Sequence, residues 1–388
     1  MKVLLVNKFL YPKGGSETYV FEVGKELQNQ GCSVSYFGQY NENNIVGNSQ
    51  DLLAKEKALN PFSLIYSRDA YKKFLKLLKA EKPDIVHLNN INFQLTPSII
   101  YAARACNVPV VWTIHDPQLV CPNHRLFIEQ KMEVCTKCVH GDVKNCVKNR
   151  CFAGSLSKSI IGYLEAKKYL KSDIYGYVSQ FICPSQFMAD MLKNRFDDDK
   201  ITVLRNYCKF SKNICVDKDD YILYYGRISE EKGIRTLLKA MPSDIKLKIA
   251  GRGPLENIMT DLPDNIEFVG FKSGDELKEL IRRAKFSIYP SEWYENCPFS
   301  IIESISFGTP VIGANIGGIP ELIDEGKTGL LFEAGNIQDL KDKITYLYNN
   351  PEILNEMINN TVNCNFTDLN EYCDNLIELY KSVCEDKQ

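Results

Sequence analysis

Short runs of apolar residues alternate with amphipathic stretches along almost the whole chain. Residues 3–6 form one continuous apolar run, and residues 33–37 form another after an amphipathic stretch that ends at Gly31. Apolar runs without polar alternation are typical of parallel strands that are covered on both faces. The chain therefore begins as a strand, a helix and a second strand, and this order predicts an α/β fold.

The same alternation continues toward the C-terminus. Further strands are predicted at residues 83–87, 109–114, 181–185, 201–204, 221–225, 247–250, 266–269, 286–289, 310–312 and 329–332. Helices are expected between them, including one at residues 62–80, one that opens at residues 251–254 and one that starts at Gly317. Residues 209–220 are polar and poorly patterned, so we interpret them as a linker between two domains. A chain of 388 residues is also too long for one ordinary hydrophobic core.

Residues 286–321 carry the strongest functional pattern, a strand, a polar loop, a helix and a strand. Pro298 suits a first helical position, because its ring fixes φ and its missing N–H would be unpaired there anyway. Glu295 and Glu303 bracket the helix start, where unpaired N–H groups and a partial positive charge attract anions. We hypothesise that a sugar nucleotide binds here, with phosphate on the helix start, Glu295 on sugar hydroxyls and Glu303 on the ribose diol.

A glycine pair follows the first strand. Gly14 and Gly15 open the first crossover, but the segment lacks the G-x-G-x-x-G pattern, so a nicotinamide enzyme loses support. Glycines let a ligand approach the backbone closely, and the following helix would direct its dipole at that ligand. The alternative is a flexible turn in which Ser16 caps the helix.

Two cations flank a predicted strand-to-helix turn in the second half of the chain. Arg227 and Lys232 could clamp a diphosphate, because a leaving nucleoside diphosphate gains negative charge that fixed cations and amides stabilise. Each charge-assisted contact is worth about 1.5–3 kcal/mol. The alternative is a pair of ordinary surface cations, which contribute little. The acidic strings 197–199 and 217–219 are interpreted as solvated loop charges, so a metal-dependent mechanism lacks its residues.

His115 and Asp116 directly follow the predicted strand at 109–114. Polar residues in this position lie at the carboxyl edge of a parallel sheet, where such folds bind ligands. A carboxylate can orient an imidazole, so the pair is a stronger candidate than an isolated histidine.

The chain has fourteen cysteines, and five of them cluster between residues 121 and 151. No apolar run reaches the length of a membrane span, and the first run is too short for a signal peptide. We therefore expect a cytoplasmic protein, whose cysteines are not a disulfide framework. The C-x-x-C spacing suggests a structural zinc ion. The preferred ligands are Cys121, Cys135, Cys138 and Cys151, with Cys146, His124 and His140 as alternates. Free thiols in an irregular loop are the alternative.

The net charge argues against nucleic acid as a binding partner. The net charge is −2, and no bulk basicity points to nucleic acid. The lysines at 72, 73, 76 and 79 are interpreted as a solvated helix face, with peripheral contact to a membrane at its inner surface as the alternative.

Five motifs in order resemble family 4 of the retaining glycosyltransferases, which have the GT-B fold and are also described as glycosyl transferases group 1. They are Gly14-Gly15-x-Glu17, Thr113-x-His115-Asp116, Gly226-Arg227 with Lys232-Gly233, Gly251-x-Gly253, and Glu295 with Glu303. The cysteine cluster after the His-Asp pair resembles a sub-family trait. The resemblance covers nearly the whole chain and implies two facing Rossmann-like domains with a cleft between them.

The resemblance also implies the domain bounds. Residues 1–208, with a cysteine-rich insertion at 119–154, would form the acceptor-binding domain. Residues 209–365 would form the nucleotide-sugar-binding domain, and residues 366–388 would be a helix that packs back on the first domain. A zinc ion would brace the insertion without taking part in catalysis.

The implied activity is transfer of a sugar from a nucleoside-diphosphate sugar to a glycan or lipid-linked acceptor with retained configuration. It would need no metal cofactor and would serve polysaccharide or glycoconjugate assembly. The implied catalytic residues are His115, Arg227, Lys232 and Glu295. The implied donor contacts are Gly14, Gly15, Glu17, Gly226, Arg252, Asn296, Pro298, Phe299, Ser300 and Glu303. The alternatives are a GT-B-fold sugar-nucleotide epimerase and a zinc-braced binding protein without catalysis.

Overall fold

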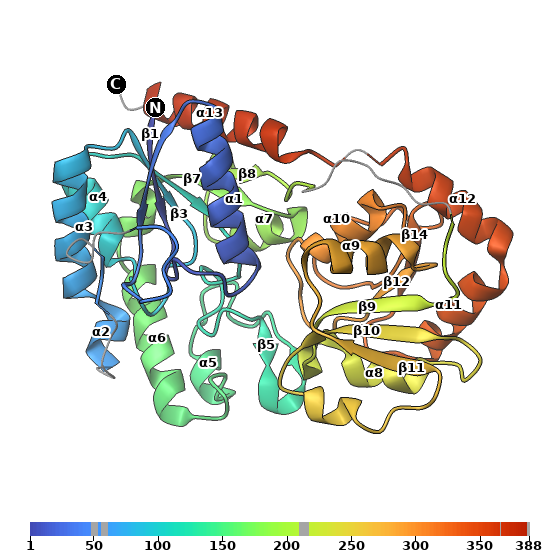
Figure 1. The fold of residues 1–388 in the computed structure, drawn as a ribbon. Coiled ribbons are helices and arrows are strands. Elements are labelled where there is room, and N and C mark those ends of the chain that lie inside the picture. Colours follow the sequence, from blue (N-terminus) through green and yellow to red (C-terminus); the bar gives the residue numbers. More distant parts are fainter. Residues whose placement is uncertain (48–52, 56–60, 209–216, 365, 386–388) are drawn as a thin grey trace. The chain divides into compact units, whose positions relative to one another are not determined.

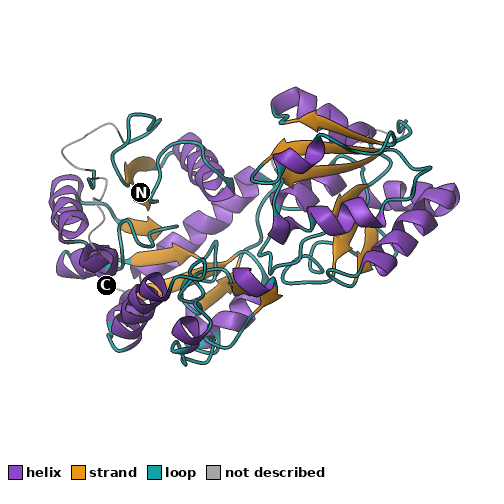
Figure 2. Cartoon of the chain, turned by 90° about the horizontal axis from the view of Figure 1, so that it is seen from below, coloured by secondary structure: helices purple, strands orange, loops and turns teal. Residues whose placement is uncertain are grey.

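The computed structural model describes residues 1–47, 53–55, 61–208, 217–364 and 366–385. The chain divides into two compact units, of which unit 1 comprises Met1–Arg205 with Leu369–Gln388 and unit 2 comprises Asn206–Asp368. Each unit contains one six-stranded parallel sheet with helices around it (Figures 1 and 2). Most of the predicted linker, residue 365 and residues 386–388 lie outside the described residues.

Unit 1 has the strand order β2-β1-β3-β4-β7-β8. These strands are β1 (Lys2–Val6), β2 (Ser33–Phe37), β3 (Ile85–Leu88), β4 (Val110–Thr113), β7 (Val178–Cys183) and β8 (Ile201–Val203). Its helices are α1 (Gly15–Asn29), α2 (Pro61–Ile65), α3 (Arg68–Glu81), α4 (Ser98–Ala105), α5 (Asn145–Lys148), α6 (Leu156–Leu170), α7 (Gln186–Leu192) and α13 (Leu369–Glu385). Every residue of β3 and β4 is buried, as expected for strands between two helical layers.

Unit 2 has the strand order β11-β10-β9-β12-β13-β14. The strands are β9 (Ile222–Arg227), β10 (Leu247–Arg252), β11 (Ile266–Gly270), β12 (Ser287–Tyr289), β13 (Val311–Ala314) and β14 (Gly329–Phe332). The helices are α8 (Ile234–Ala240), α9 (Gly274–Arg283), α10 (Phe299–Ser306), α11 (Ile337–Asn349) and α12 (Pro351–Thr361). The order of the strands reverses between β9 and β12, and such a switch point is where open α/β sheets bind ligands.

Helix α13 belongs to unit 1, although it follows the whole of unit 2 in the sequence. Its Tyr380 Oη lies 2.6 Å from His87 Nδ1, and His87 Nε2 lies 2.7 Å from Thr113 Oγ1. Nearer its start, Tyr372 Oη lies 2.8 Å from Tyr19 Oη. Burial lowers the pKa of His87 to about 3, so this imidazole is neutral. Buried hydrogen bonds therefore tie the end of the chain to β3, β4 and α1.

Three helix predictions differ from the structure. The helix expected at 62–80 is split into α2 and α3, because Ser67 accepts a hydrogen bond from Ala70 N and starts a new helix. No helix starts at Gly317, since Gly318 N donates to Glu295 O at 2.8 Å and holds the segment as a turn. After β10 there is only a short 3-10 turn, η5 (Glu256–Met259).

Among the described helices, none has the length and apolar character needed to cross a membrane.

Candidate active site

The switch point of unit 2 brings together two turns that are far apart in the sequence. Strand β9 ends at Arg227 and leads into the 3-10 turn η4 (Glu230–Lys232). The neighbouring strand β12 ends at Tyr289, and the loop after it leads to α10. The residues expected to clamp a diphosphate and to hold a sugar therefore meet at the carboxyl edge of one sheet.

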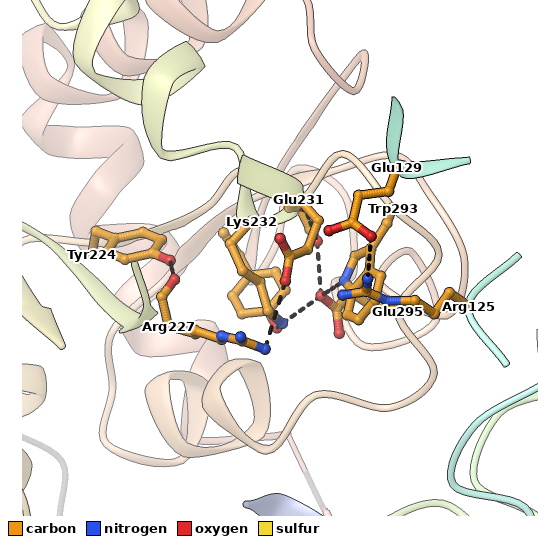
Figure 3. A network of polar contacts seen from close by, with 10 residues as sticks. Arg125, Glu129, Tyr224, Arg227, Glu231, Lys232, Trp293 and Glu295 are labelled. Carbon is orange, nitrogen blue, oxygen red and sulfur yellow. Dashed lines mark hydrogen bonds and ion pairs between the residues drawn. The ribbon is translucent and has the colours of Figure 1, made fainter. Parts of the chain in front are cut away.

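Lys232 and Glu295 contact each other directly (Figure 3). Lys232 Nζ lies 2.5 Å from Glu295 Oε1 and donates to Tyr289 Oη at 3.0 Å. Glu295 Oε1 also accepts hydrogen bonds from Ser291 Oγ at 2.8 Å and from Trp293 Nε1 at 2.5 Å. The lysine and the glutamate were expected to bind separate groups of the ligand, whereas here they form one ion pair.

The Lys232–Glu295 pair is largely withdrawn from water, with 18% and 11% of the two side chains exposed. Burial acts to lower the pKa of Lys232, but the adjacent Glu295 carboxylate outweighs burial and raises the pKa above its ordinary value. The ammonium therefore stays charged. It also lies 5.2 Å from the ring centre of Tyr289 and 5.7 Å from that of Trp293, positions that favour a cation.

Arg227 is the more accessible of the two cations. Its side chain is 57% exposed, and its Nη1 lies 3.8 Å from Glu231 Oε1. Its carbonyl oxygen accepts a hydrogen bond from Tyr224 Oη at 2.7 Å, which fixes the backbone (Figure 3). At 3.8 Å the ion pair is long, and the guanidinium is open to solvent although only 12% of the Glu231 side chain is exposed.

Gly233 allows the two turns to approach closely. Its φ of +68° is in the left-handed region, and a Cβ at this position would lie 1.8 Å from Pro290 O. Lys232 precedes this glycine directly, and Ser291 follows Pro290. Close backbone contact between the turns thus sets the distance between the lysine and its carboxylate partner.

Helix α10 is held in place by buried polar contacts. Tyr225 Oη donates to Ser300 O and lies 3.1 Å from Ser304 Oγ. Asn206 Nδ2 donates to Cys297 O at 2.7 Å, just before the helix. Pro298 occupies the N-cap position in extended backbone, one residue before its expected place, because α10 begins at Phe299.

The other donor contacts expected in unit 2 lie around this helix and at the end of β10. Asn296, Pro298, Phe299, Ser300 and Glu303 are partly exposed at the start of α10 or within it. Gly226 is exposed at the end of β9, next to Gly251 of β10. Arg252 is exposed, and its guanidinium carbon lies 4.5 Å from the ring centre of Phe271. Phe271 is 56% exposed, so this cation–π pair is accessible to a ligand.

In unit 1, His115 is oriented by Asn89, which was not among the expected site residues. His115 Nε2 lies 2.8 Å from Asn89 Oδ1, and Asn89 Nδ2 donates to Val6 O at 3.4 Å, which fixes the amide orientation. Burial lowers the pKa of His115 to about 3, so the ring is neutral. Asn89 follows β3 as His115 follows β4, and this shared position at the strand ends was the available signal.

The expected orienting residue, Asp116, has a different contact. Its Oδ1 accepts from the backbone amide of Gln118 at 3.2 Å. Burial raises the pKa of Asp116 to about 6, while Lys8 and the Gln118 amide act in the opposite direction. The carboxyl group is thus used to shape the turn after His115.

The glycine pair of unit 1 begins a helix, as expected. Gly14 is the N-cap of α1 in extended backbone, and Gly15 is its first residue. Glu17 is buried, and its Oε1 accepts from Asn7 Nδ2 at 3.1 Å. Asn7 Oδ1 in turn accepts from Asn90 N at 3.0 Å. Glu17 thus braces the ends of β1 and β3 from within unit 1.

The cysteine segment also lies in unit 1. All four expected ligands and Cys146 line one small cavity, with Cys121, Cys138 and Cys146 buried. In the described residues, no group of three or more His, Cys, Asp or Glu side chains has the arrangement of an ion-binding site.

Two family models together match almost the whole chain. The model described as Glycosyltransferase Family 4 matches residues 13–208, and the model described as Glycosyl transferases group 1 matches residues 209–363. An uncharacterized glycosyltransferase of Methanocaldococcus jannaschii is 25% identical over 91% of this chain and 90% of its own length. The sulfoquinovosyl transferase of Arabidopsis thaliana is 35% identical, over 34% of this chain and 27% of its own length.

Solved structures show the same fold. A glycosyltransferase of Rickettsia africae superposes with a TM-score of 0.69 at 19% identity, covering 99% of each chain. The Anabaena protein HepE, in complex with UDP, superposes with a TM-score of 0.68 at 16% identity, covering 98% of this chain and 100% of that chain. The predicted GT-B fold with two Rossmann-like domains is thereby confirmed. The chain belongs to glycosyltransferase family 4 and is a sugar-transferring enzyme of the glycosyl transferases group 1 type.

Proposed function

We propose that this glycosyltransferase transfers a sugar from a nucleoside-diphosphate sugar to an acceptor hydroxyl with retention of the anomeric configuration. The observation that carries the proposal is the group formed by Arg227, Lys232 and Glu295 at the switch point of unit 2. It combines two cations with a carboxylate beside the N-terminus of α10. The diphosphate of the donor complements the cations, and the hydroxyls of its sugar complement the carboxylate.

In this proposal, the diphosphate contacts Arg227, Lys232 and the amide groups at the start of α10. Glu303 holds the ribose diol, and Glu295 accepts hydrogen bonds from hydroxyls of the donor sugar. Only Oε1 of Glu295 is used in the contacts with Lys232, Ser291 and Trp293, so Oε2 can face the sugar. Lys232 can then bind a phosphate oxygen while Glu295 still fixes its position.

The chemical step breaks the bond between C1 of the sugar and the β-phosphate oxygen. The bonding electrons stay on the leaving diphosphate, where the two cations and the helix amides stabilise the added charge. The acceptor oxygen attacks C1 from the same face, and its proton passes to the leaving phosphate oxygen. Configuration is therefore retained, and the proton needs no side-chain base.

Unit 1 is proposed to bind the acceptor, and His115 and the Gly14-Gly15 turn are its proposed substrate contacts. A neutral His115 suits a contact with sugar hydroxyls, because it offers a hydrogen bond without a charge that would repel an oxocarbenium-like centre. We do not assign it the role of general base.

The donor base is proposed to lie near the pair formed by Arg252 and Phe271, and UDP is the first nucleotide to test. Support comes from the Anabaena HepE structures, whose complexes contain UDP and UDP-glucose. Assembly of a polysaccharide or glycoconjugate on a glycan or lipid-linked acceptor is the proposed context.

The test is a transfer assay with UDP-, GDP- and ADP-sugars against a panel of glycosides, with the anomeric configuration of the product read by NMR. Lys232→Ala and Glu303→Ala should abolish transfer, whereas the exposed control Lys246→Ala should leave it unchanged. An inverted product would contradict the retaining mechanism. Conversion of the donor alone, without acceptor, would instead indicate an epimerase.

A further inference from the structure

Helix α6 of unit 1 buries the more polar side of its sequence. Its buried residues are Ser159, Gly162, Glu165 and Tyr169. Surface helices of globular proteins normally direct an apolar stripe at the core and polar residues at water. Of these four residues, only Tyr169 brings a large apolar group to the interior. The polarity of α6 is thus largely reversed relative to an ordinary surface helix.

The opposite side of α6 carries an exposed apolar ridge, which we define as Leu156, Ile160 and Leu164. Each of these side chains is between 40% and 46% exposed. Their spacing of four residues places them above one another on one face of the helix. Leu170, the last residue of α6, is exposed as well. Exposed apolar side chains that gather on one face, unlike isolated ones, mark a surface for interaction.

A groove of about 340 Å³ lies between the ridge and the neighbouring helix α5. It is lined by Lys144, Val147, Lys148, Ile160, Tyr163 and Leu164. Four of these side chains are aliphatic or aromatic, and two are cationic. The groove therefore offers apolar walls with positive charge beside them.

Helix α2 extends the apolar surface. Helices α2 and α5 both pack against α6, at the same end of unit 1 (Figure 1). Tyr169 Oη donates to the carbonyl oxygen of Ile65, the last residue of α2, at 2.6 Å. Phe62 of α2 is 81% exposed. A large aromatic ring is therefore held in solvent on a helix that is fixed to α6.

The contacts on the inner side of α6 fix its rotation. Ser159 Oγ donates to Ser155 O at 2.8 Å and accepts from Phe152 N at 3.3 Å. The ring of Phe152 packs on Gly162, where a Cβ would lie 2.3 Å from it. Helix α6 cannot turn its ridge toward the core without breaking these contacts. The exposure of the ridge is therefore built into the packing of unit 1.

The segment that contains α5 and α6 is strongly cationic. Residues 144–171 include seven lysines and arginines but one acidic residue, Glu165, which is buried. The seven exposed cations are Lys144, Lys148, Arg150, Lys158, Lys167, Lys168 and Lys171. A second copy of this chain would bring the same charges together, so repulsion disfavours self-association through this face. An anionic surface would be attracted to it.

We propose that the ridge, the groove and Phe62 dock on the surface of an anionic lipid bilayer, with α6 lying in the plane of the interface. Helices that lie in this plane combine an apolar face with lysines and arginines. The apolar side chains would enter the boundary between head groups and acyl chains. The lysines would extend along that boundary and place their ammonium groups at the lipid phosphates.

This surface differs from the α3 lysines, which were the expected alternative for a membrane contact. Lys72, Lys76 and Lys79 are exposed on α3, but the α3 residues Phe74, Leu77 and Leu78 are buried. Helix α3 therefore offers charge without an exposed apolar face, whereas α6 offers both. The proposal does not depend on the sugar donor or on the site in unit 2.

The test is sedimentation of the purified full chain with lipid vesicles. We expect binding to an equimolar mixture of phosphatidylcholine and phosphatidylglycerol and little binding to phosphatidylcholine alone. Two double variants, Ile160→Ser with Leu164→Ser and Lys167→Gln with Lys171→Gln, should each weaken binding about tenfold or more. All four positions are exposed, so the fold should persist, and thermal unfolding checks it.

Two matched controls locate the contact. Lys72→Gln with Lys76→Gln removes the same charge from α3, and Val362→Ser removes a similarly exposed apolar side chain from unit 2. Both should bind the mixed vesicles as the wild type does. If the α3 variant lost as much binding as the α6 charge variant, the attraction would be a property of the whole surface and the assignment to α6 would be overturned.

A second measurement reports directly on the ridge. Leu164→Trp should add a tryptophan emission that shifts to shorter wavelength on the mixed vesicles, whereas the emission added by Val362→Trp should not shift. Vesicle-bound protein without this shift would overturn the proposal, as would a wild type that does not bind the mixed vesicles. A dimer that Leu164→Ser dissociates would also overturn it and would assign this face to self-association.

Discussion

Lys232 and Glu295 lie 63 residues apart in the sequence, yet their side-chain charges are 2.5 Å apart. The contact exists because β9 and β12 are neighbours in the sheet, and the turn after each strand carries one partner. Ser291 and Trp293 also donate to the carboxylate, so its position is fixed before any ligand binds. The pair therefore presents a positioned cation and a positioned acceptor at the same edge of unit 2.

The first prediction concerns this pair. Lys232→Met and Glu295→Gln should each destabilise unit 2 by about 3 kcal/mol, because each leaves a buried charge without its partner. The double variant should lose much less stability than the sum of the two single losses. The coupling energy from chemical denaturation should be about 1–3 kcal/mol. As a control, the exposed Lys327–Asp324 pair should show a coupling below about 1 kcal/mol. Additive losses at Lys232 and Glu295 would mean that the contact is not formed in solution.

The second prediction concerns the approach of the two turns. Gly233→Ala should destabilise unit 2 and weaken donor binding, because the new Cβ would meet Pro290 O. Gly326→Ala is a matched control, since it also has a positive φ of +78° but no neighbouring atom within 4 Å. The control should lower the free energy of unfolding by only ~1–2 kcal/mol, which is the cost of a non-glycine residue in the left-handed conformation. If thermal denaturation showed an equal fall in unfolding temperature for both variants, the two turns would not be closely packed at Gly233.

The third prediction concerns the attachment of α13. Tyr380→Phe removes the hydrogen bond to His87 Nδ1 and leaves that buried nitrogen without this partner, at a cost of about 1–3 kcal/mol. Amide hydrogen exchange should become faster in α13 and stay unchanged in α11 of unit 2. Tyr346→Phe, at a side chain that is 47% exposed, should change neither the stability nor the amide exchange of either helix. Unchanged exchange in the Tyr380 variant would show that the contact does not hold the helix.

The fourth prediction concerns pH. Burial raises the pKa of Glu165 in α6 to about 8, from an ordinary value of 4.5, and Lys168 acts in the opposite direction. A raised folded-state pKa means that the stabilisation is full below about pH 4.5 and is lost as the pH rises to about 8. Between these two pKa values the free energy of unfolding of the wild type should fall by ~1.4 kcal/mol per pH unit, and Glu165→Gln should remove this dependence. The variant should therefore be more stable than the wild type at pH 8.5. Glu356→Gln, at an exposed site, should keep the wild-type slope in urea titrations.

The strands could be predicted well from the sequence because a buried parallel strand leaves a direct signature, a short apolar run such as residues 221–225. The helix at 62–80 was less accurate, since the cap at Ser67 depends on a hydrogen bond that composition does not reveal. The turn at Gly317 was predicted wrongly because its conformation depends on a contact with Glu295. Local patterns therefore predicted elements, and errors arose where a distant segment determines the backbone.

The same limit applies to the candidate site. Motifs identified Arg227, Lys232, Glu295 and His115 as candidates, but a motif does not show which side chains pair. The strand order of the sheet brings Lys232 and Glu295 together, and Asn89 became visible only as the neighbour of His115. The expected ligand set of the cysteines stays a prediction, since Cys135 and the alternate Cys146 line the same cavity.

Calorimetric binding of UDP, GDP and ADP to the purified full chain tests the central claim most directly. The account predicts that one of the three binds, and that Arg227→Ala and Lys232→Ala each weaken its binding at least tenfold, equivalent to ~1.4 kcal/mol. Arg235→Ala, which removes a nearby cation paired with Glu230, should leave the affinity unchanged. Binding that is unaffected by both site variants, or no binding of any nucleoside diphosphate by the folded wild type, would contradict the proposed donor site.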